Sequence, residues 1–111
     1  MIISSDSQNG VTIVSINGRV DGASAPELEG ELSSRIRDGS VRILLDCNEM
    51  NYISSAGLRV FLLAAKRCKQ AGGLLSIAAL QPSCRSVIEM GGFHTIIDCY
   101  DSRDEALAAN A

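Results

Sequence analysis

The hydrophobic pattern of this chain changes repeatedly between the spacing of a β-strand and the spacing of an α-helix. Short runs that are apolar throughout, or at alternate positions, are separated by longer amphipathic runs with only short turns between them. Strands joined through helices run parallel in one sheet, because the helix returns the chain to the edge where it started. The sequence therefore predicts an α/β fold of order ββαβαβαβα, with a mixed, mostly parallel sheet of about four or five strands and about four helices.

Two N-terminal strands are expected at residues 2–4 and 11–17. The segment VTIVSIN has the composition of a strand, and Gly18 is expected to end it. Asn9 and Gly10 stand before this segment, and an Asn-Gly pair favours the tight turn of a β-hairpin. The hairpin would supply an antiparallel edge to the sheet.

Two helix starts carry a capping motif. Ser24 and Glu27 have the spacing of a capping box, in which the serine side chain bonds the backbone of the first turn. Gly39 suits the C-terminal end of the same helix. Ser102 and Glu105 repeat the spacing before a terminal helix. We therefore expect helices to begin directly after Ser24 and Ser102.

A nearly continuous apolar run, VRILLDC at residues 41–47, has the length of a strand. A strand with so few polar positions suits the centre of a sheet that is covered on both faces. Asp46 at its end is expected to be solvated. The next helix spans LRVFLLAAKRCKQAGG, residues 58–73. The remaining expected elements are a strand at 74–80, a helix at 82–92 and a strand at 95–100.

Charge and composition narrow the class of partner. The chain has 111 residues and a net charge of -3, with no tryptophan, and its basic residues are scattered or lie near predicted helix ends. This distribution argues against a nucleic-acid footprint or a polybasic membrane patch, so the expected partner is a protein. The N-terminus lacks the pattern of a signal peptide, and no apolar run is long enough to span a bilayer. We expect a cytoplasmic protein.

The cysteines do not form a metal or redox motif. They are too far apart for a CxxC pattern, and the chain has only one histidine, so we predict no metal site and no cofactor. An unpaired cysteine in a reducing compartment behaves as a small hydrophobic residue. Free buried thiols are therefore expected at Cys47, Cys68, Cys84 and Cys99.

The stretch YISSAGL, residues 52–58, places Ser54 and Ser55 where the central strand leads into the next helix. Ligands and partners favour this edge of a parallel sheet. A serine there either caps the helix or carries an anionic group that the helix N-terminus stabilises. Gly57 is unfavourable within a first helical turn, so its presence indicates that another group approaches the backbone closely.

The run DCNEMNYISSAGLRVFLLAAKRCKQAGGLLSIAAL, residues 46–80, resembles the STAS-domain family, in particular bacterial anti-sigma-factor antagonists. NGRVDGASAPEL, residues 17–28, is similar to the loop and first helix of that family. QPSCRSVIEMGGFHTIIDCYDSRDEAL, residues 81–107, is similar to its C-terminal part. The resemblance implies that residues 1–111 form a single STAS domain.

Members of this family change partners when a serine in an aspartate-serine-(serine or threonine)-glycine-leucine motif is phosphorylated. Alignment on the Gly57-Leu58 pair implies that Ser55 is the phosphoacceptor. Ser54 stands where many members carry aspartate, and Ala56 stands where they carry serine or threonine. The resemblance implies a partner-binding surface formed by Asp21, Ser54, Ser55, Ala56, Gly57 and Leu58.

The resemblance also implies a function. The unphosphorylated protein would bind a serine kinase that acts as an anti-sigma factor, so that the sigma factor is released, and phosphorylation would end this binding. A cognate phosphatase is a possible further partner. The alternative is a STAS partner-switching scaffold with another output, such as secretion, biofilm formation or signalling. A nucleotide-binding STAS module is the weaker alternative.

An enzymatic function is not expected. SSAGL lacks the G-x-S-x-G frame of a nucleophile elbow, and His94, the sole histidine, follows a helix end. The pairs Gly72-Gly73 and Gly91-Gly92 belong to no phosphate-binding fingerprint, and both follow helical runs as caps. The sequence therefore favours a protein-binding switch over a catalyst.

Overall fold

The computed structural model describes residues 1–109, in which five strands form one sheet in the order β1-β2-β3-β4-β5. β1 pairs antiparallel with β2, and the other neighbouring strands pair parallel. The strands are β1 (Ile2–Gln8), β2 (Val11–Val20), β3 (Arg42–Ile53), β4 (Leu74–Ala78) and β5 (Asp98–Tyr100). The helices are α1 (Ala25–Arg37), α2 (Ser55–Gln70), α3 (Pro82–Met90), the 3₁₀ helix η1 (Phe93–Thr95) and α4 (Arg103–Ala109). The predicted α/β class and element order are confirmed.

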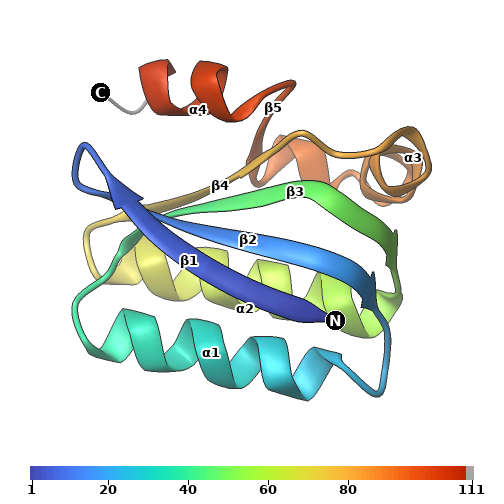
Figure 1. Ribbon diagram of the computed structural model, residues 1–111, viewed down its shortest axis with the longest axis horizontal. Helices are drawn as coiled ribbons and strands as arrows, with labels where there is room; N and C mark the ends of the chain where they lie inside the picture. The colour runs from blue at the N-terminus through green and yellow to red at the C-terminus, as the bar shows by residue number, and fades with distance from the viewer. Residues whose placement is uncertain (110–111) are drawn as a thin grey trace.

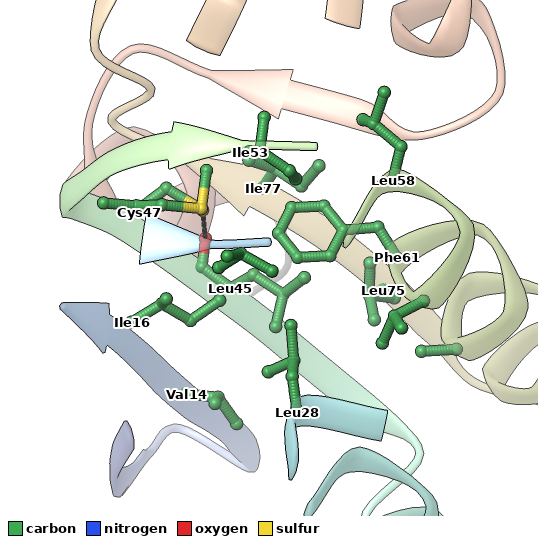
Figure 2. Packing of buried hydrophobic residues seen from close by; sticks show 14 of the residues in the cluster. Val14, Ile16, Leu28, Leu45, Cys47, Ile53, Leu58, Phe61, Leu75 and Ile77 are labelled. Atoms are coloured by element: carbon green, nitrogen blue, oxygen red, sulfur yellow. Dashed lines mark hydrogen bonds between the residues drawn. The ribbon is translucent and has the colours of Figure 1, made fainter. Parts of the chain in front are cut away.

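Helices cover both faces of the sheet (Figure 1). α1 and α2 lie side by side under one face, where Leu28 and Phe61 pack with Leu45 of β3 (Figure 2). α4 lies over the other face, where Leu107 packs with Leu44 of β3. Successive side chains of a strand point to opposite faces, so Leu44 and Leu45 enter two different cores. This explains why the central strand is apolar at consecutive positions.

The N-terminal hairpin is longer than the sequence pattern predicted. Asn9 and Gly10 both have positive φ, 54° and 79°, as a two-residue hairpin turn requires, so the predicted turn is confirmed. β1 extends to Gln8 rather than ending at residue 4, and most of its side chains are exposed. An exposed edge strand needs only backbone pairing, so it carries no hydrophobic signal of its length. The expectation that Gly18 ends β2 is also wrong, because the strand continues to Val20 through a register shift beside Gly18.

The two capping motifs have different outcomes. α1 begins after Ser24 as predicted, but the side chain of Ser24 makes no capping hydrogen bond to the helix. Its hydroxyl donates instead to the carbonyl oxygen of Arg19 at 2.9 Å, so the predicted capping box is wrong. Before α4, the backbone N–H of Glu105 donates to the hydroxyl of Ser102 at 3.1 Å, which confirms the predicted serine cap. Hydrogen bonds within the turn at residues 19–24 therefore engage the first serine, whereas the second serine caps its helix.

The other differences concern where elements end. β3 continues past the predicted limit at residue 47 as far as Ile53, and it pairs with the far end of β2. The last strand is restricted to Asp98–Tyr100, because residues 93–95 form η1 instead of the start of a strand. η1 follows Gly92, whose φ of 73° turns the chain out of α3. These changes place Phe93 near the start of α2, at the region described next.

Candidate functional site

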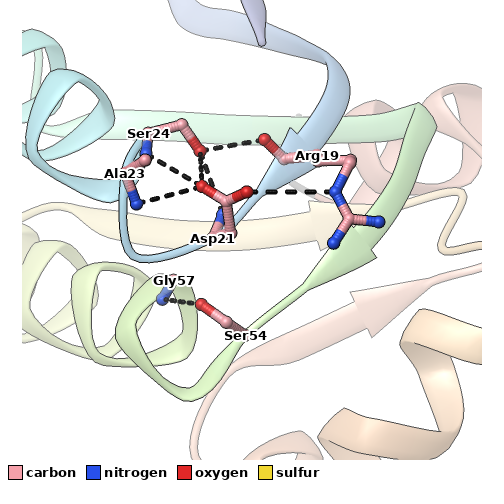
Figure 3. A network of polar contacts seen from close by, with 6 residues as sticks. All are labelled: Arg19, Asp21, Ala23, Ser24, Ser54 and Gly57. Atoms are coloured by element: carbon pink, nitrogen blue, oxygen red, sulfur yellow. Dashed lines mark hydrogen bonds and ion pairs between the residues drawn. The ribbon is translucent and has the colours of Figure 1, made fainter.

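Two turns between a strand and a helix lie side by side at one edge of the sheet. β2 and β3 are parallel neighbours, and their last residues, Val20 and Ile53, are paired in register. The backbone N–H of Ser54 then donates to the carbonyl oxygen of Val20 at 2.8 Å. As a result the turn at residues 21–24 lies over the first turn of α2 (Figure 3). The structure thus brings together Asp21 and the YISSAGL stretch, which the family resemblance predicts to share one surface.

The two adjacent serines have different positions. Ser54 is half-buried, and its hydroxyl accepts a hydrogen bond from the backbone N–H of Gly57 at 3.3 Å, so Ser54 is the N-cap of α2 (Figure 3). Ser55 is the first residue of the helix and is exposed. Among residues 1–109 its hydroxyl has no hydrogen-bond partner. The capping role therefore belongs to Ser54, and the Ser55 hydroxyl is accessible for modification.

Gly57 fits closely against the end of β2. A Cβ atom at this position would lie 2.7 Å from Cγ1 of Val20 and 2.9 Å from Cγ1 of Ile53. The group that approaches the helix backbone, as the glycine indicated, is thus the buried side chain of Val20 within the same domain. Leu58 is also buried, and Ala56 is half-buried. Within the first turn of α2 the side chain open to a partner is therefore that of Ser55.

The carboxylate of Asp21 is held by its own turn. Its Oδ1 accepts hydrogen bonds from the backbone N–H groups of Ala23 and Ser24, both at 3.0 Å (Figure 3). It also lies 3.2 Å from the Ser24 hydroxyl, whose single hydrogen it shares with the carbonyl oxygen of Arg19. Its Oδ2 lies 3.8 Å from Nε of Arg19. The hydrogen bond from the Ser24 backbone is the largest cause that lowers the pKa of Asp21 from its ordinary value. A fixed, ionised carboxylate therefore lies beside the start of α2.

Arg19 and Tyr52 complete this edge, although neither is among the site residues predicted from the sequence. They are paired in register on β2 and β3, and the guanidinium carbon of Arg19 lies 4.2 Å from the centre of the Tyr52 ring. Tyr52 is 40% exposed. An arginine stacked on an exposed aromatic ring is a frequent feature of protein interfaces. The sequence feature that could have indicated this pair is Tyr52, an aromatic residue directly before the loop that leads into α2.

An apolar groove adjoins Ser55. It has a volume of about 290 Å³ and is lined by Ser55, Leu58, Arg59 and Leu62 of α2 together with Phe93 of η1. Arg59 is exposed and supplies the only formal charge among these lining residues. The sequence pattern gave no sign of the groove, because Phe93 reaches α2 only through the path of the chain after α3.

His94 is exposed on η1, and it does not line the groove beside Ser55. Residues 1–109 contain no group of three or more histidine, cysteine, aspartate or glutamate side chains placed to hold a metal ion. In the same residues no helix is long and apolar enough to cross a membrane.

The expectation that Asp46 is solvated is wrong, because its carboxylate is held in an ion pair. Its side chain is 12% exposed, and its Oδ2 lies 2.8 Å from Nε of Arg103 on α4. Arg103 also donates to the hydroxyl of Ser15 at 3.2 Å, and the N–H of Asn48 donates to Asp46 at 3.0 Å. Asp46 therefore anchors α4 to the sheet.

The predicted free thiols are confirmed. Cys47, Cys68 and Cys84 are buried, Cys99 is half-buried, and none forms a disulfide. Burial raises the pKa of Cys68 to about 11, and it raises the pKa of Cys47 well above the ordinary value. Such thiols are protonated at neutral pH and serve as packing groups.

Comparison with known proteins identifies the family. A family model described as the STAS domain matches residues 3–106. BtrV of Bordetella bronchiseptica, whose name describes it as an anti-sigma factor antagonist, is 41% identical over 109 residues, which cover 98% of this chain and 94% of that protein. This chain therefore belongs to the STAS domain family. A second relative, named anti-sigma F factor antagonist in Paenibacillus polymyxa, is 26% identical over 106 residues, which cover 95% of this chain and 91% of that protein.

Solved structures share the fold. A crystal structure of an anti-sigma factor antagonist from Thermotoga maritima matches with a TM-score of 0.92 at 18% identity and covers 96% of this chain and 92% of its own. SpoIIAA in its unphosphorylated form matches with a TM-score of 0.81 at 16% identity, covering 96% and 93%. SpoIIAA of Bacillus in its phosphorylated form matches with a TM-score of 0.76 at 15% identity, covering 99% and 100%. At these identities the likeness concerns the fold alone.

Proposed function

We propose that this protein binds an anti-sigma factor and that phosphorylation of Ser55 controls the binding. In the unphosphorylated state it binds a serine kinase that acts as the anti-sigma factor, and the sigma factor is released. The kinase then phosphorylates Ser55 and the complex separates, and a cognate phosphatase restores the binding form. The protein itself acts as a non-enzymatic regulator, and residues 1–111 serve as one STAS domain.

The division of roles between the two serines carries this proposal. Ser54 supplies the cap of α2, so the fold does not need the hydroxyl of Ser55. Ser55 is exposed, which a kinase requires of its substrate. The existence of SpoIIAA, a protein of the same fold, in phosphorylated and unphosphorylated forms supports the same chemistry.

The partner surface consists of Asp21, Ser54, Ser55, Ala56, Gly57 and Leu58. Ser55 presents its side chain to the partner, whereas Gly57 and Leu58 are buried and shape the turn from below. The carboxylate of Asp21 provides a fixed negative charge on the neighbouring turn. Its contact with a cation of the partner would orient the complex.

Phosphorylation ends the binding by electrostatics and desolvation. A phosphoserine carries a charge of about -1.5 to -2 at neutral pH, which is costly to bury in a packed interface. The first turn of α2 tolerates this anion, because the N-terminus of a helix stabilises negative charge. The modification can therefore change the affinity for the partner while the domain stays folded.

The test begins with the partner. A pull-down from the source cell, with mass spectrometry of bait and prey, identifies the bound protein and any phosphate on the bait. The purified partner and nucleotide are then expected to place phosphate on Ser55. Phosphate found only on Ser54, Ser24 or Ser102 would show that the phosphoacceptor was chosen wrongly. A partner unrelated to sigma control would favour the alternative of a scaffold with another output.

Calorimetry then measures affinity for that partner. Ser55→Ala is expected to bind like the wild type. Ser55→Asp is expected to bind at least tenfold more weakly, which corresponds to a loss of about 1.4 kcal/mol in binding free energy. Ser34→Asp is the matched control, because it adds the same charge at an exposed position of α1. Equal affinities of the phosphorylated and unphosphorylated wild type for the partner would show that phosphorylation does not control the binding. The cytoplasmic location stays a prediction from the sequence.

A further inference from the structure

Arg59 lies one helical turn after Ser55 on α2. Residues four positions apart on a helix are neighbours, with Cβ atoms about 5–6 Å from each other. The side chains of Ser55 and Arg59 both line the apolar groove, to which η1 contributes Phe93. A phosphate on Ser55 would therefore lie within reach of the Arg59 guanidinium group.

Arg59 makes no polar contact with the described part of the unphosphorylated domain. It is exposed, and among residues 1–109 it makes no hydrogen bond and no ion pair. Other arginines of the chain are engaged: Arg19, Arg35, Arg67, Arg85 and Arg103 contact an acidic or hydroxyl group. The side chain next to the proposed phosphoacceptor is thus a free cation.

We propose that Arg59 is the residue that binds the phosphate of phosphorylated Ser55, and that it binds an acidic group of the partner when Ser55 is unmodified. The proposal rests on the function proposed above, in which Ser55 is the phosphoacceptor. Phosphorylation then changes the surface in two ways. It adds a negative charge, and it withdraws a positive charge from the partner.

The chemistry of the groove favours this pairing. A guanidinium group binds phosphate through two parallel hydrogen bonds, which is stronger and more directional than a single ion pair. The other lining side chains, Leu58, Leu62 and Phe93, are apolar, so they offer the guanidinium no competing acceptor. They also exclude water from one side of the pair, which strengthens the electrostatic attraction.

The experiment places phosphoserine at position 55 during translation, so that no kinase is needed. The second ionisation of the phosphate is followed by ³¹P NMR at low ionic strength. A guanidinium group in contact with the phosphate favours the dianion, so the phosphate pKa of the wild type is expected to lie at least about 0.5 units below that of Arg59→Gln. Arg59→Lys is expected to lie between the two, because it keeps the charge and loses the paired hydrogen bonds.

Lys66→Gln is the matched control. Lys66 is exposed on the same helix, about 16 Å beyond Ser55 along the helix axis, so its removal changes the net charge equally without removing a contact to the phosphate. Asp21 and His94, the titratable groups on the neighbouring turn and on η1, are unchanged in every variant. Equal phosphate pKa values in the wild type and Arg59→Gln would overturn the proposal. An equal change of the phosphate pKa in Lys66→Gln would also overturn the proposal. It would indicate that the phosphate responds to the net charge of the protein and not to a contact with Arg59.

A second measurement uses the partner. Arg59→Gln in the unphosphorylated protein is expected to weaken binding at least fivefold, and Lys66→Gln is expected to leave it unchanged. Unchanged binding by Arg59→Gln would overturn the partner contact. The phosphate titration does not depend on any kinase, so failure of a kinase to modify Ser55 would refute the proposed function and leave the titration result intact. Circular dichroism of each variant checks that the domain is folded.

Discussion

The backbone N–H of Ser54 donates to the carbonyl oxygen of Val20 at 2.8 Å, and this bond joins the end of β2 to the start of α2. It fixes the turn that carries Asp21 against the turn that carries Ser55 (Figure 3). Ser54 therefore makes two contacts that hold the site, one through its backbone and one through its side chain. The neighbouring Ser55 side chain makes none within residues 1–109.

This difference predicts unequal effects of alanine at the two serines. Ser54→Ala removes the cap of α2 and is expected to lower the free energy of unfolding by about 1 kcal/mol. Ser55→Ala removes an exposed hydroxyl and is expected to change it by less than about 0.5 kcal/mol. Urea denaturation of the two variants measures the difference. A larger loss of stability in Ser55→Ala than in Ser54→Ala would show that Ser55, and not Ser54, caps α2.

Substitution of Gly57 tests the close packing between α2 and β2. Gly57→Ala places a methyl group 2.7 Å from a branched, buried side chain and is expected to destabilise the domain by about 1–3 kcal/mol. Gly30→Ala is the control, because Gly30 lies within α1 and a Cβ atom there would meet no neighbouring atom within 4 Å. It is expected to stabilise the domain by about 0.5–1 kcal/mol. Stabilisation by both variants would contradict the contact.

The ion pair between Asp46 and Arg103 predicts how α4 is held. Arg103→Gln leaves a carboxylate that is 12% exposed without its cation, and a loss of about 1.5–3 kcal/mol is expected. Arg85→Gln breaks an exposed pair with Asp101 and is expected to cost less than about 1 kcal/mol. Hydrogen exchange in Arg103→Gln is expected to accelerate first in α4. Unchanged exchange there would show that the apolar contacts of α4 suffice.

The hydrogen bonds to Asp21 predict a dependence of stability on pH. The pKa of Asp21 is lower in the folded protein than its ordinary value of 3.8, so the ionised carboxylate favours folding. This contribution to the free energy of unfolding is fully present above pH 3.8, and it is lost as the pH falls through the lowered pKa of the folded protein. The stability difference between wild type and Asp21→Asn is therefore expected to shrink as the solution is acidified across that range. Denaturation at several pH values measures it, and a difference that grows on acidification would contradict the assignment.

The sequence predicted the order of elements well where a local pattern determines the structure. The alternation of apolar residues gave the strands and helices, and Asn9-Gly10 gave the hairpin turn. It did not give the length of β1, because an exposed edge strand has little hydrophobic pattern. The hydrogen bonds of Ser24 were also not predicted, because the serine-to-glutamate spacing of a capping box does not show that the turn at residues 19–24 folds back on the serine hydroxyl.

By itself the sequence determined the α/β class, the central apolar strand and the two hydroxyl groups at the start of α2. These depend on residues close together in the chain. Only the tertiary structure decided which serine caps the helix, why position 57 is a glycine and which side chains line the groove beside Ser55. Each of these depends on β2 or η1 meeting α2 across a long stretch of intervening chain, and a local pattern holds no information about such contacts.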